Sequence, residues 1–296
     1  MTASHTRTVS PRGPFGLANQ NRHFGGWITT GPDGGTVVMG FPVEGWSGSA
    51  AVALREDTGV GVTGTVTGTA DPDVAWRQAM AVLSLDVDAT GYADVGRRDA
   101  VIGALQAEYA HLRPVLFHSP YEAACAFVIA HRLSVVAGRR IRRRLAEAYG
   151  TAMVVEGTTV HAFPAPEALL GVDAFPSLTP EKIERLHGIA RSALSGDLAR
   201  ARLRAMPVAE AMADVRRLRG VGEFFASAIV LRGAGVVDAI PGDDITLAGV
   251  RRLYGLAQPP GADEFAAIAE AWRPYRMWCS VLVHVAERRH REAAGH

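Results

Sequence analysis

The hydrophobic pattern changes its period close to Tyr92, and this change constrains the fold more than any other feature of the chain. Before it, short runs rich in Val and Thr alternate with turns such as the Gly/Pro-rich segment 31–35, a pattern typical of strands. One helix is expected here, over residues 73–83. The expected strand segments are 27–30, 36–41, 50–54 and 60–66. Residues 1–12 are polar and expected to be loose, so we predict a small α+β module over residues 13–92.

After Tyr92 the apolar residues recur at helical spacing. Ser119 followed by Pro120 and, three residues after the cap, Glu122 is a strong helix start. Thr179 followed by Pro180 begins a second helix. The predicted helices are 100–109, 119–130, 134–149, 179–194, 208–218, 223–231, 244–254, 263–272 and 273–290. The sequence therefore predicts a mainly α protein, in which an all-helical body over residues 93–296 follows the α+β module.

Composition excludes several classes of protein. Of the 296 residues, 48% are hydrophobic and 21% charged, which is typical of a globular protein. No apolar run approaches the ~20 residues of a membrane span, and the polar N-terminus lacks the apolar core of a signal peptide. Cys125 and Cys279 are too few for a disulfide framework, a four-thiolate zinc site or an iron–sulfur cluster. We expect a cytoplasmic protein that does not interact with membranes.

The charge is unevenly distributed. Residues 1–110 carry 7 basic and 11 acidic side chains, whereas residues 111–296 carry 24 basic and 19 acidic ones. An anionic partner would therefore dock on the second part. The only lysine is Lys182, and the other 30 basic side chains are arginines. Almost no lysine is thus available for Schiff-base chemistry.

The most informative stretch is 218–222, Leu-Arg-Gly-Val-Gly. Two glycines permit a tight turn between helices, and they leave backbone N–H groups open to a phosphate at the start of the second helix. A plain interhelical turn would have the same sequence. About 20 residues later, however, a Pro-Gly turn presents Asp243 and Asp244 at a helix start. One carboxylate can cap that helix, and the other is free to face a cleft.

Together these segments resemble the helix–hairpin–helix DNA glycosylase superfamily, most closely its 3-methyladenine DNA glycosylase II type. The hairpin, Arg232-Gly233 and the loop 240–244 (Ile-Pro-Gly-Asp-Asp) carry the resemblance. The segment from Ser119 to Ser134 resembles the family's minor-groove wedge, and residues 272–276 (Trp-Arg-Pro-Tyr-Arg) resemble its penultimate element. The fold implied is a two-lobed helical body, with the N-terminal module as an extra domain of this subfamily.

The resemblance assigns catalysis to Asp244, which stands just before the helix beginning Ile245-Thr246. A carboxylate beside the sugar C1′ stabilises the oxocarbenium charge that develops as the base leaves, and it can orient or deprotonate water. An N-alkylated purine is already cationic and needs no general acid. Asp243 is the rival, with helix capping as its alternative role.

The resemblance also implies the remaining site residues. The base pocket would involve Phe224 or Phe225, of which one lines the pocket and the other packs, together with Phe15 and His284; His284 stands where the best-known member has a tryptophan. A histidine can stack on a cationic base only when it is neutral, and histidines change charge near neutral pH. The DNA contacts would come from Gly220, Gly222, His131 and Arg132. The carbonyls of Leu218 and Val221 would hold a structural Na⁺ or K⁺, with no cofactor required.

The chain is accordingly expected to be a monomeric, monofunctional glycosylase acting on duplex DNA that contains alkylated bases, without the lyase activity that some relatives obtain from a lysine after the hairpin. Three alternatives stay open. They are a non-catalytic protein that binds damaged DNA, a glycosylase for oxidised bases or uracil, and an unrelated helical regulator. The five arginines within 139–144 fit either a DNA-binding stripe or a solvated, carboxylate-paired face.

Overall fold

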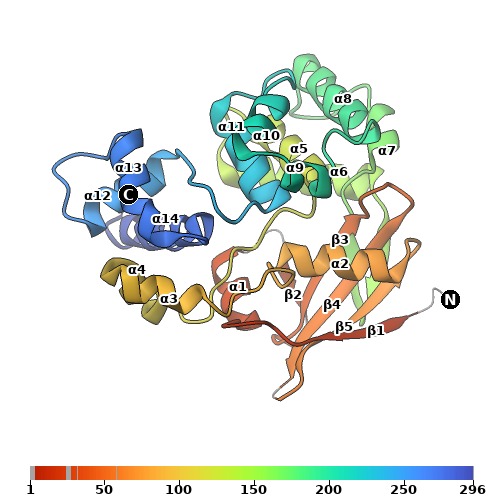
Figure 1. Ribbon diagram of the computed structural model, residues 1–296. Coiled ribbons are helices and arrows are strands. Elements are labelled where there is room, and N and C mark those ends of the chain that lie inside the picture. The colour runs from red at the N-terminus through yellow and green to blue at the C-terminus, as the bar shows by residue number, and fades with distance from the viewer. Residues whose placement is uncertain (1–3, 25–27, 32, 58, 296) are drawn as a thin grey trace.

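The computed structural model describes residues 4–24, 28–31, 33–57 and 59–295, which form an antiparallel sheet joined to a helical body in two lobes (Figure 1). Trp27 in the predicted strand, Pro32 in the predicted turn and His296 at the end of the predicted body lie outside the described residues. No helix in the described ranges is long and apolar enough to cross a membrane.

The sheet has five strands in the order β1-β5-β4-β3-β2, and all neighbouring pairs are antiparallel. Its two faces are covered by different elements. Helix α2 (Pro72–Val82) packs on one face, where Ala79 and Val52 belong to one hydrophobic core. A hairpin from the helical body packs on the other, where Met153 shares a core with Ala51 and Ala53. Successive strand residues point to opposite faces, so residues 49–54 of β4 are buried on both. The strands are β1 (His5–Val9), β2 (Thr29–Thr30), β3 (Val37–Pro42), β4 (Ser49–Asp57) and β5 (Gly61–Gly68), and the hairpin is β6 (Ala152–Val155) and β7 (Thr158–His161).

The first lobe of the body adjoins the sheet and contains one hydrophobic core. Tyr121 and Leu186 are fully buried in it. The sequence predicted its main helix starts because the caps are local: Ser119 accepts a hydrogen bond from the Glu122 amide and Thr179 from the Lys182 amide. The helices are α5 (Pro120–Ala130), α6 (Val135–Tyr149), α7 (Pro166–Leu170), α8 (Pro180–Leu194), α9 (Arg200–Ala205), α10 (Val208–Val215), α11 (Glu223–Ala228) and the π-helix η1 (Ile229–Ala234).

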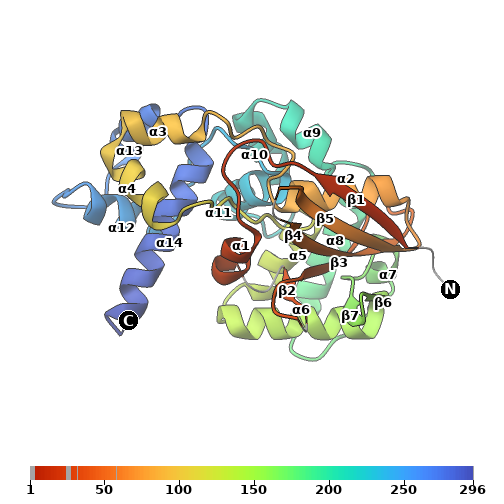
Figure 2. The same ribbon diagram turned by 90° about the horizontal axis from the view of Figure 1, so that it is seen from below.

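The second lobe combines helices from two distant parts of the chain. Tyr92 and Ile102, from the segment after the sheet, share a core with Trp272 and Trp278 near the C-terminus. Along the chain, one part of the second lobe comes first, the first lobe follows, and the rest of the second lobe comes last. Figure 2 shows α14 running through this lobe, away from the sheet. The helices are α3 (Tyr92–Arg98), α4 (Ala100–Glu108), α12 (Asp244–Leu253), α13 (Ala262–Ala269), the short 3₁₀-helix η2 (Glu270–Trp272) and α14 (Arg276–Ala293).

The structure confirms the mainly α fold with a small N-terminal sheet and corrects three details. Residues 5–9, expected to be loose, form β1, because the edge of β5 offers them a partner. Residues 17–24 form helix α1 (Leu17–Phe24) in a module for which only one helix was expected, and the helix is held partly by Gln20, whose side chain donates to the His111 carbonyl. The hairpin β6–β7 interrupts a body expected to be all-helical; the sheet surface stabilises two strands of four residues each.

Candidate active site

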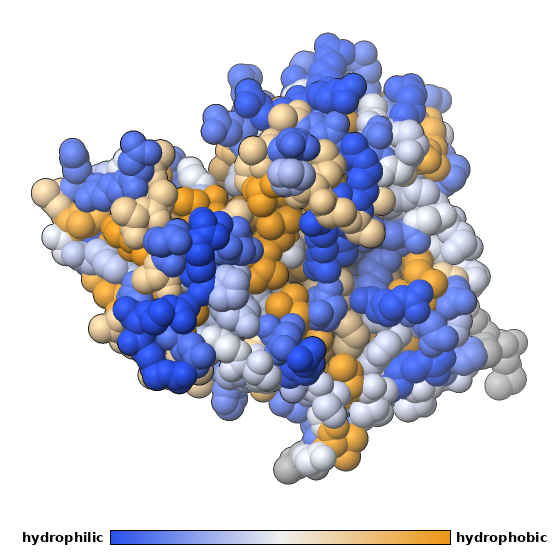
Figure 3. Space-filling view, in the orientation of Figure 1, coloured by the Kyte–Doolittle hydropathy of each residue, from blue (hydrophilic) through white to orange (hydrophobic). Residues whose placement is uncertain are grey.

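A cavity of about 620 Å³ opens between the two lobes, in a hollow whose surface is largely apolar (Figure 3). The first lobe contributes α5, α11 and η1, and the second contributes the start of α12 and one face of α14. This is a usual size and composition for a small-molecule pocket. The lining residues used below are Phe117, Phe127, Phe224, Arg232, Asp243, Asp244, Met277, Val281 and His284.

The two adjacent aspartates have different partners. Asp243 is the N-cap of α12: Oδ1 accepts the Thr246 amide at 2.9 Å and Oδ2 accepts the Thr246 hydroxyl at 2.6 Å. Asp244 is the first residue of α12, is exposed and lines the cavity. Within the described ranges, no hydrogen bond or ion pair involves its carboxylate. At this helix N-terminus, the carboxylate of Asp243 caps the helix, whereas the carboxylate of Asp244 is open to the cavity.

His284 faces this pair from α14. Its Nδ1 lies 3.2 Å from Oδ1 of Asp243 and 3.4 Å from the Thr246 hydroxyl. Burial alone would raise the pKa of Asp243, but the hydrogen bonds from His284 and Thr246 outweigh it and hold that pKa below its usual value. Asp243 is therefore an ionised structural group that orients the histidine at the cavity wall.

The opposite wall is aromatic. The Phe117 and Phe127 rings lie 5.3 Å apart between centroids, and Phe224, 55% exposed, lies edge-on to Phe127 at 6.4 Å. A flat ring entering the cavity would lie between these phenylalanines and the α14 wall of Met277 and Val281. Sequence reasoning missed Phe117 and Phe127. Their spacing carries no catalytic signal, and only the packing of α5 against α11 brings them together.

The turn at residues 218–222 has the hairpin geometry expected of it. The Val221 amide donates to the Leu218 carbonyl at 3.0 Å, Gly220 has a φ of +87°, and Gly222 is the N-cap of α11. Gly220 is a position where a side chain would be strained. Within the described residues, no group of three or more His, Cys, Asp or Glu side chains is arranged to hold a metal. Binding of a monovalent cation by the backbone carbonyls of Leu218 and Val221 stays a prediction.

Comparisons with known proteins agree with this geometry. No protein-family model matches the chain. A DNA-3-methyladenine glycosylase of Bacillus subtilis is 24% identical over 201 residues, which are 66% of this chain and 66% of that protein. A probable bifunctional transcriptional activator/DNA repair enzyme AlkA of Mycobacterium tuberculosis is 30% identical over 167 residues, 54% of this chain and 32% of that protein. Both matches span less than two thirds of the relative's length.

Solved structures match almost the whole chain. A 3-methyladenine DNA-glycosylase from Archaeoglobus fulgidus superimposes with a TM-score of 0.76 at 17% identity, over 96% of this chain and 98% of that one. An 8-oxoguanine glycosylase/lyase from Clostridium acetobutylicum, in complex with double-stranded DNA, gives 0.70 at 14% identity, over 99% and 98%. The chain has the helix–hairpin–helix DNA glycosylase fold. The fold implied by the hairpin and the Pro-Gly-Asp-Asp loop is thereby confirmed.

Two of the predicted pocket residues of this glycosylase fold are not among those lining the cavity. Phe15 is buried in the core beneath the sheet, where the Arg113 guanidinium lies 5.7 Å from its ring centroid. Phe225 turns away from the cavity. It stacks on Phe127 at 5.1 Å and meets the His131 ring edge-on at 6.1 Å. Phe224 is the phenylalanine that faces the cavity, so the expectation that one of the pair lines it and the other packs agrees with the structure.

The segment 131–134 forms an exposed loop between α5 and α6. His131 ends α5, and Arg132 has a φ of +59°, a conformation that residues other than glycine rarely adopt. Leu133, Val135 and Val136 are 40%, 66% and 76% exposed. The loop and the first turn of α6 therefore present an arginine and three apolar side chains to solvent, a composition suited to inserting between unstacked bases.

The five arginines within residues 139–144 do not all fit one of the two predicted roles, carboxylate pairing or DNA binding. Arg142 is half-buried and pairs with the buried Glu122, and Arg143 lies 3.5 Å from Glu147. Arg139 and Arg140 are exposed, and within the described ranges neither has a hydrogen bond or ion pair. Only part of the run is thus available to a phosphate backbone.

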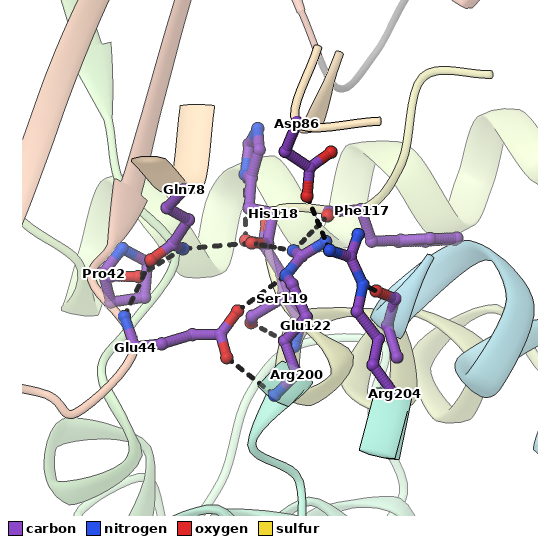
Figure 4. A network of polar contacts seen from close by, with 11 residues as sticks. Pro42, Glu44, Gln78, Asp86, Phe117, His118, Ser119, Glu122, Arg200 and Arg204 are labelled. Atoms are coloured by element: carbon purple, nitrogen blue, oxygen red, sulfur yellow. Dashed lines mark hydrogen bonds and ion pairs between the residues drawn. The ribbon is translucent and has the colours of Figure 1, made fainter. Parts of the chain in front are cut away.

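A buried network fixes the aromatic wall to the sheet module (Figure 4). The Arg200 Nε donates to Glu44 at 3.0 Å, and its Nη2 donates to the carbonyls of Phe117 and His118 at 3.2 and 2.8 Å. From the other side, the Phe117 amide donates to the carbonyl of Arg232 at 2.9 Å. Arg232 lies in the π-helix and is among the residues lining the cavity, and its Nη2 donates to the Val115 carbonyl at 2.6 Å. The contacts of Arg200 and Arg232 could not be predicted from the sequence.

Proposed function

We propose that the chain is a monofunctional DNA glycosylase that hydrolyses the N-glycosidic bond of alkylated bases in duplex DNA. The observation that carries the proposal is Asp244, an available carboxylate at a helix N-terminus in an aromatic cavity of about 620 Å³. The names of the Bacillus and Archaeoglobus relatives support the alkylated-base class.

The chemistry follows from that carboxylate. A damaged nucleotide is turned out of the duplex into the cavity, so that C1′ of its sugar lies beside Asp244. As the C1′–N bond breaks, the bonding electrons leave with the base and positive charge develops on the sugar. Asp244 stabilises this charge and accepts a proton from the water that attacks C1′. An alkylated purine leaves as a neutral base, so no proton donor is required.

The rest of the site supplies recognition. Phe224, Phe127 and Phe117 present ring faces and edges to an extracted base, and a cationic base is attracted to such faces. The hairpin amides at Gly220 and Gly222 would bind a phosphate, while His131 and Arg132 lie on the loop that would fill the gap left by the base. A Na⁺ or K⁺ held by the Leu218 and Val221 carbonyls would serve the hairpin structurally.

The direct test is to incubate the protein with duplex DNA treated with a methylating agent and to identify the released bases by chromatography. Release of 3-methyladenine supports the proposal. Release of 8-oxoguanine or uracil from duplexes that contain those bases, with no release from the methylated DNA, would reassign the substrate. Tight binding to damaged DNA with no release would favour a non-catalytic damage-binding protein.

We predict that the product DNA carries intact abasic sites. Lys182 is the only lysine of the chain and does not line the cavity, and Phe224 and Phe225 follow the hairpin where lyases have their lysine. Strand breaks should appear only after heat or alkali, and borohydride should trap no covalent complex, since trapping needs a Schiff base. Efficient trapping by both the wild type and Lys182→Met would instead point to the N-terminal amine.

A second prediction concerns His284. Its ring lines the cavity, where an aromatic face would attract a cationic base. His284→Ala is expected to slow excision of 3-methyladenine by roughly fivefold more than excision of a neutral lesion, because only the cation loses this attraction. Single-turnover rates measured for the two lesions check this.

His284→Trp should keep or increase the preference for the cationic lesion, because the indole ring presents a larger aromatic face. If His284→Ala slows excision of both lesions equally, His284 has no part in recognising the charge of the base.

A further inference from the structure

The only lysine of the chain is bound to the loop at the end of α5. Its Nζ donates to the Ile129 carbonyl at 2.8 Å and to the His131 carbonyl at 2.9 Å. These carbonyls belong to the last turn of α5, where the helix itself supplies no donors. Enclosure beneath the loop, together with the charge of Arg185, lowers the pKa of Lys182. The ammonium therefore acts as a C-terminal clamp on α5, immediately before the exposed loop.

That loop needs a clamp, because its backbone is strained. Arg132 has a φ of +59° and is not a glycine, so this conformation persists only where neighbouring contacts fix it. On one side, the His131 ring packs edge-on against Phe225. On the other, Lys182 holds the carbonyl of His131, one residue before Arg132.

The same stretch of α8 also contacts the hairpin. A Cβ placed on Gly220 would lie only 2.9 Å from the Arg185 side chain, so the hairpin backbone lies directly on this arginine. Glu184 pairs with Arg219 at 2.7 Å. Residues 182–185 thus contact both the segment before the exposed loop and the hairpin.

Lysine and arginine are not equivalent in this place. An ammonium is a compact group whose three donors can point at two converging carbonyls, whereas a guanidinium is planar and holds its donors in a rigid fork. In a chain whose other 30 basic residues are arginines, the one lysine occupies the position where the compact group fits.

We propose that Lys182 is a positioning residue: it holds the 131–133 loop to α8, and through α8 to the 218–222 hairpin, so that DNA bound on the hairpin determines where the loop inserts. The proposal rests on the proposed glycosylase function. Lys182 touches no reacting atom, and its effect is on the placement of Arg132 and Leu133.

The first experiment does not depend on activity. Arg132 is exposed in the loop and is followed by Leu133, so trypsin can cut between them. Lys182→Met should speed this cut several-fold, because the loop loses its clamp, whereas Arg191→Met, an exposed site near the end of the same helix, should not. Equal cutting rates in the wild type and Lys182→Met would overturn the proposal. Faster trypsin cutting of Lys182→Met, together with a wild type that releases no base, would support the clamp and reject the glycosylase function.

The second experiment separates positioning from binding. Lys182→Met and Lys182→Arg are expected to lower single-turnover excision by roughly 10- to 100-fold, as small displacements of positioned groups do. Affinity for undamaged duplex should change by less than about twofold, because the phosphate contacts that dominate it are kept. An equal loss of affinity and rate would make Lys182 an ordinary DNA contact and reject the proposal.

Chemical rescue guards against a variant that merely misfolds. Lys182→Cys treated with 2-bromoethylamine carries an ammonium on a thioether stem of nearly the same length as lysine. Cys125 and Cys279 are fully buried, and burial raises the pKa of both thiols, so they should escape alkylation. Recovery of slow trypsin cutting and fast excision supports the clamp. Complete alkylation without recovery of either would contradict it.

Discussion

Asp244→Asn is expected to lower the single-turnover rate of base release by about 100-fold or more, the magnitude seen when one preorganised electrostatic group is removed. Asparagine keeps the shape of the side chain and removes the charge that would stabilise the sugar cation. The fold should persist, because the cap of α12 is formed by Asp243 and not by Asp244. Duplex binding should be retained or improved, since a negative charge near the backbone is lost. Quench-flow excision and fluorescence anisotropy measure the two effects.

The matched control is Asp243→Asn, one residue away. Asp243 is held ionised by His284 and Thr246, and its lowered pKa means that it contributes stability above the pKa of the unfolded chain and loses it as pH falls through the folded pKa. Asparagine caps a helix about as well as aspartate, so the control variant should keep its fold and lose only the charge-dependent part of this stability at neutral pH. It should also lose less stability than the wild type on acidification, which thermal melts at several pH values measure. Near-normal excision in Asp244→Asn together with a large loss in Asp243→Asn would transfer the proposed catalytic role to Asp243.

The sequence predicted those features that depend on neighbouring residues alone. Ser119, Thr179 and Asp243 are caps because their side chains reach amides three residues on, and the hairpin turns because Gly220 tolerates a positive φ. From the sequence, either Asp243 or Asp244 could cap the helix while the other faced the cleft, and the structure makes Asp243 the cap. Both were expected at the start of a helix because they directly follow the Pro-Gly turn.

Features that depend on distant contacts could not be predicted in this way. Phe127 reads as one more apolar residue of α5, and it faces the cavity only because α11 brings Phe224 and Phe225 against it. Phe15 was placed in the pocket by resemblance, yet the sheet module, whose strands cannot be docked from their sequence, keeps it in its own core. The π-helix that contains Arg232 has no signature in the sequence of residues 229–234.

The affinity for undamaged duplex DNA should fall by about a thousandfold between 50 and 200 mM salt if roughly six phosphates are contacted, because each neutralised phosphate releases counterions. The excess of basic residues lies in the second part of the chain, but much of it is already paired within the protein. Arg142 pairs with Glu122 and Arg202 with Asp214. Phosphate binding should therefore depend on those arginines that have no carboxylate partner in the described ranges.

Arg140 offers the sharpest test, because it is exposed on α6, close to the loop, and without a partner among the described residues. Arg140→Gln should reduce the slope of log affinity against log salt by about 1 and weaken binding to all sequences equally. Arg7→Gln is the matched control, since Arg7 lies on the far edge of the sheet and already pairs with Asp73 at 2.7 Å. A wild-type affinity that hardly changes with salt would mean that apolar contacts by Leu133, Val135 and Val136 dominate, and that the arginines of α6 only solvate its surface.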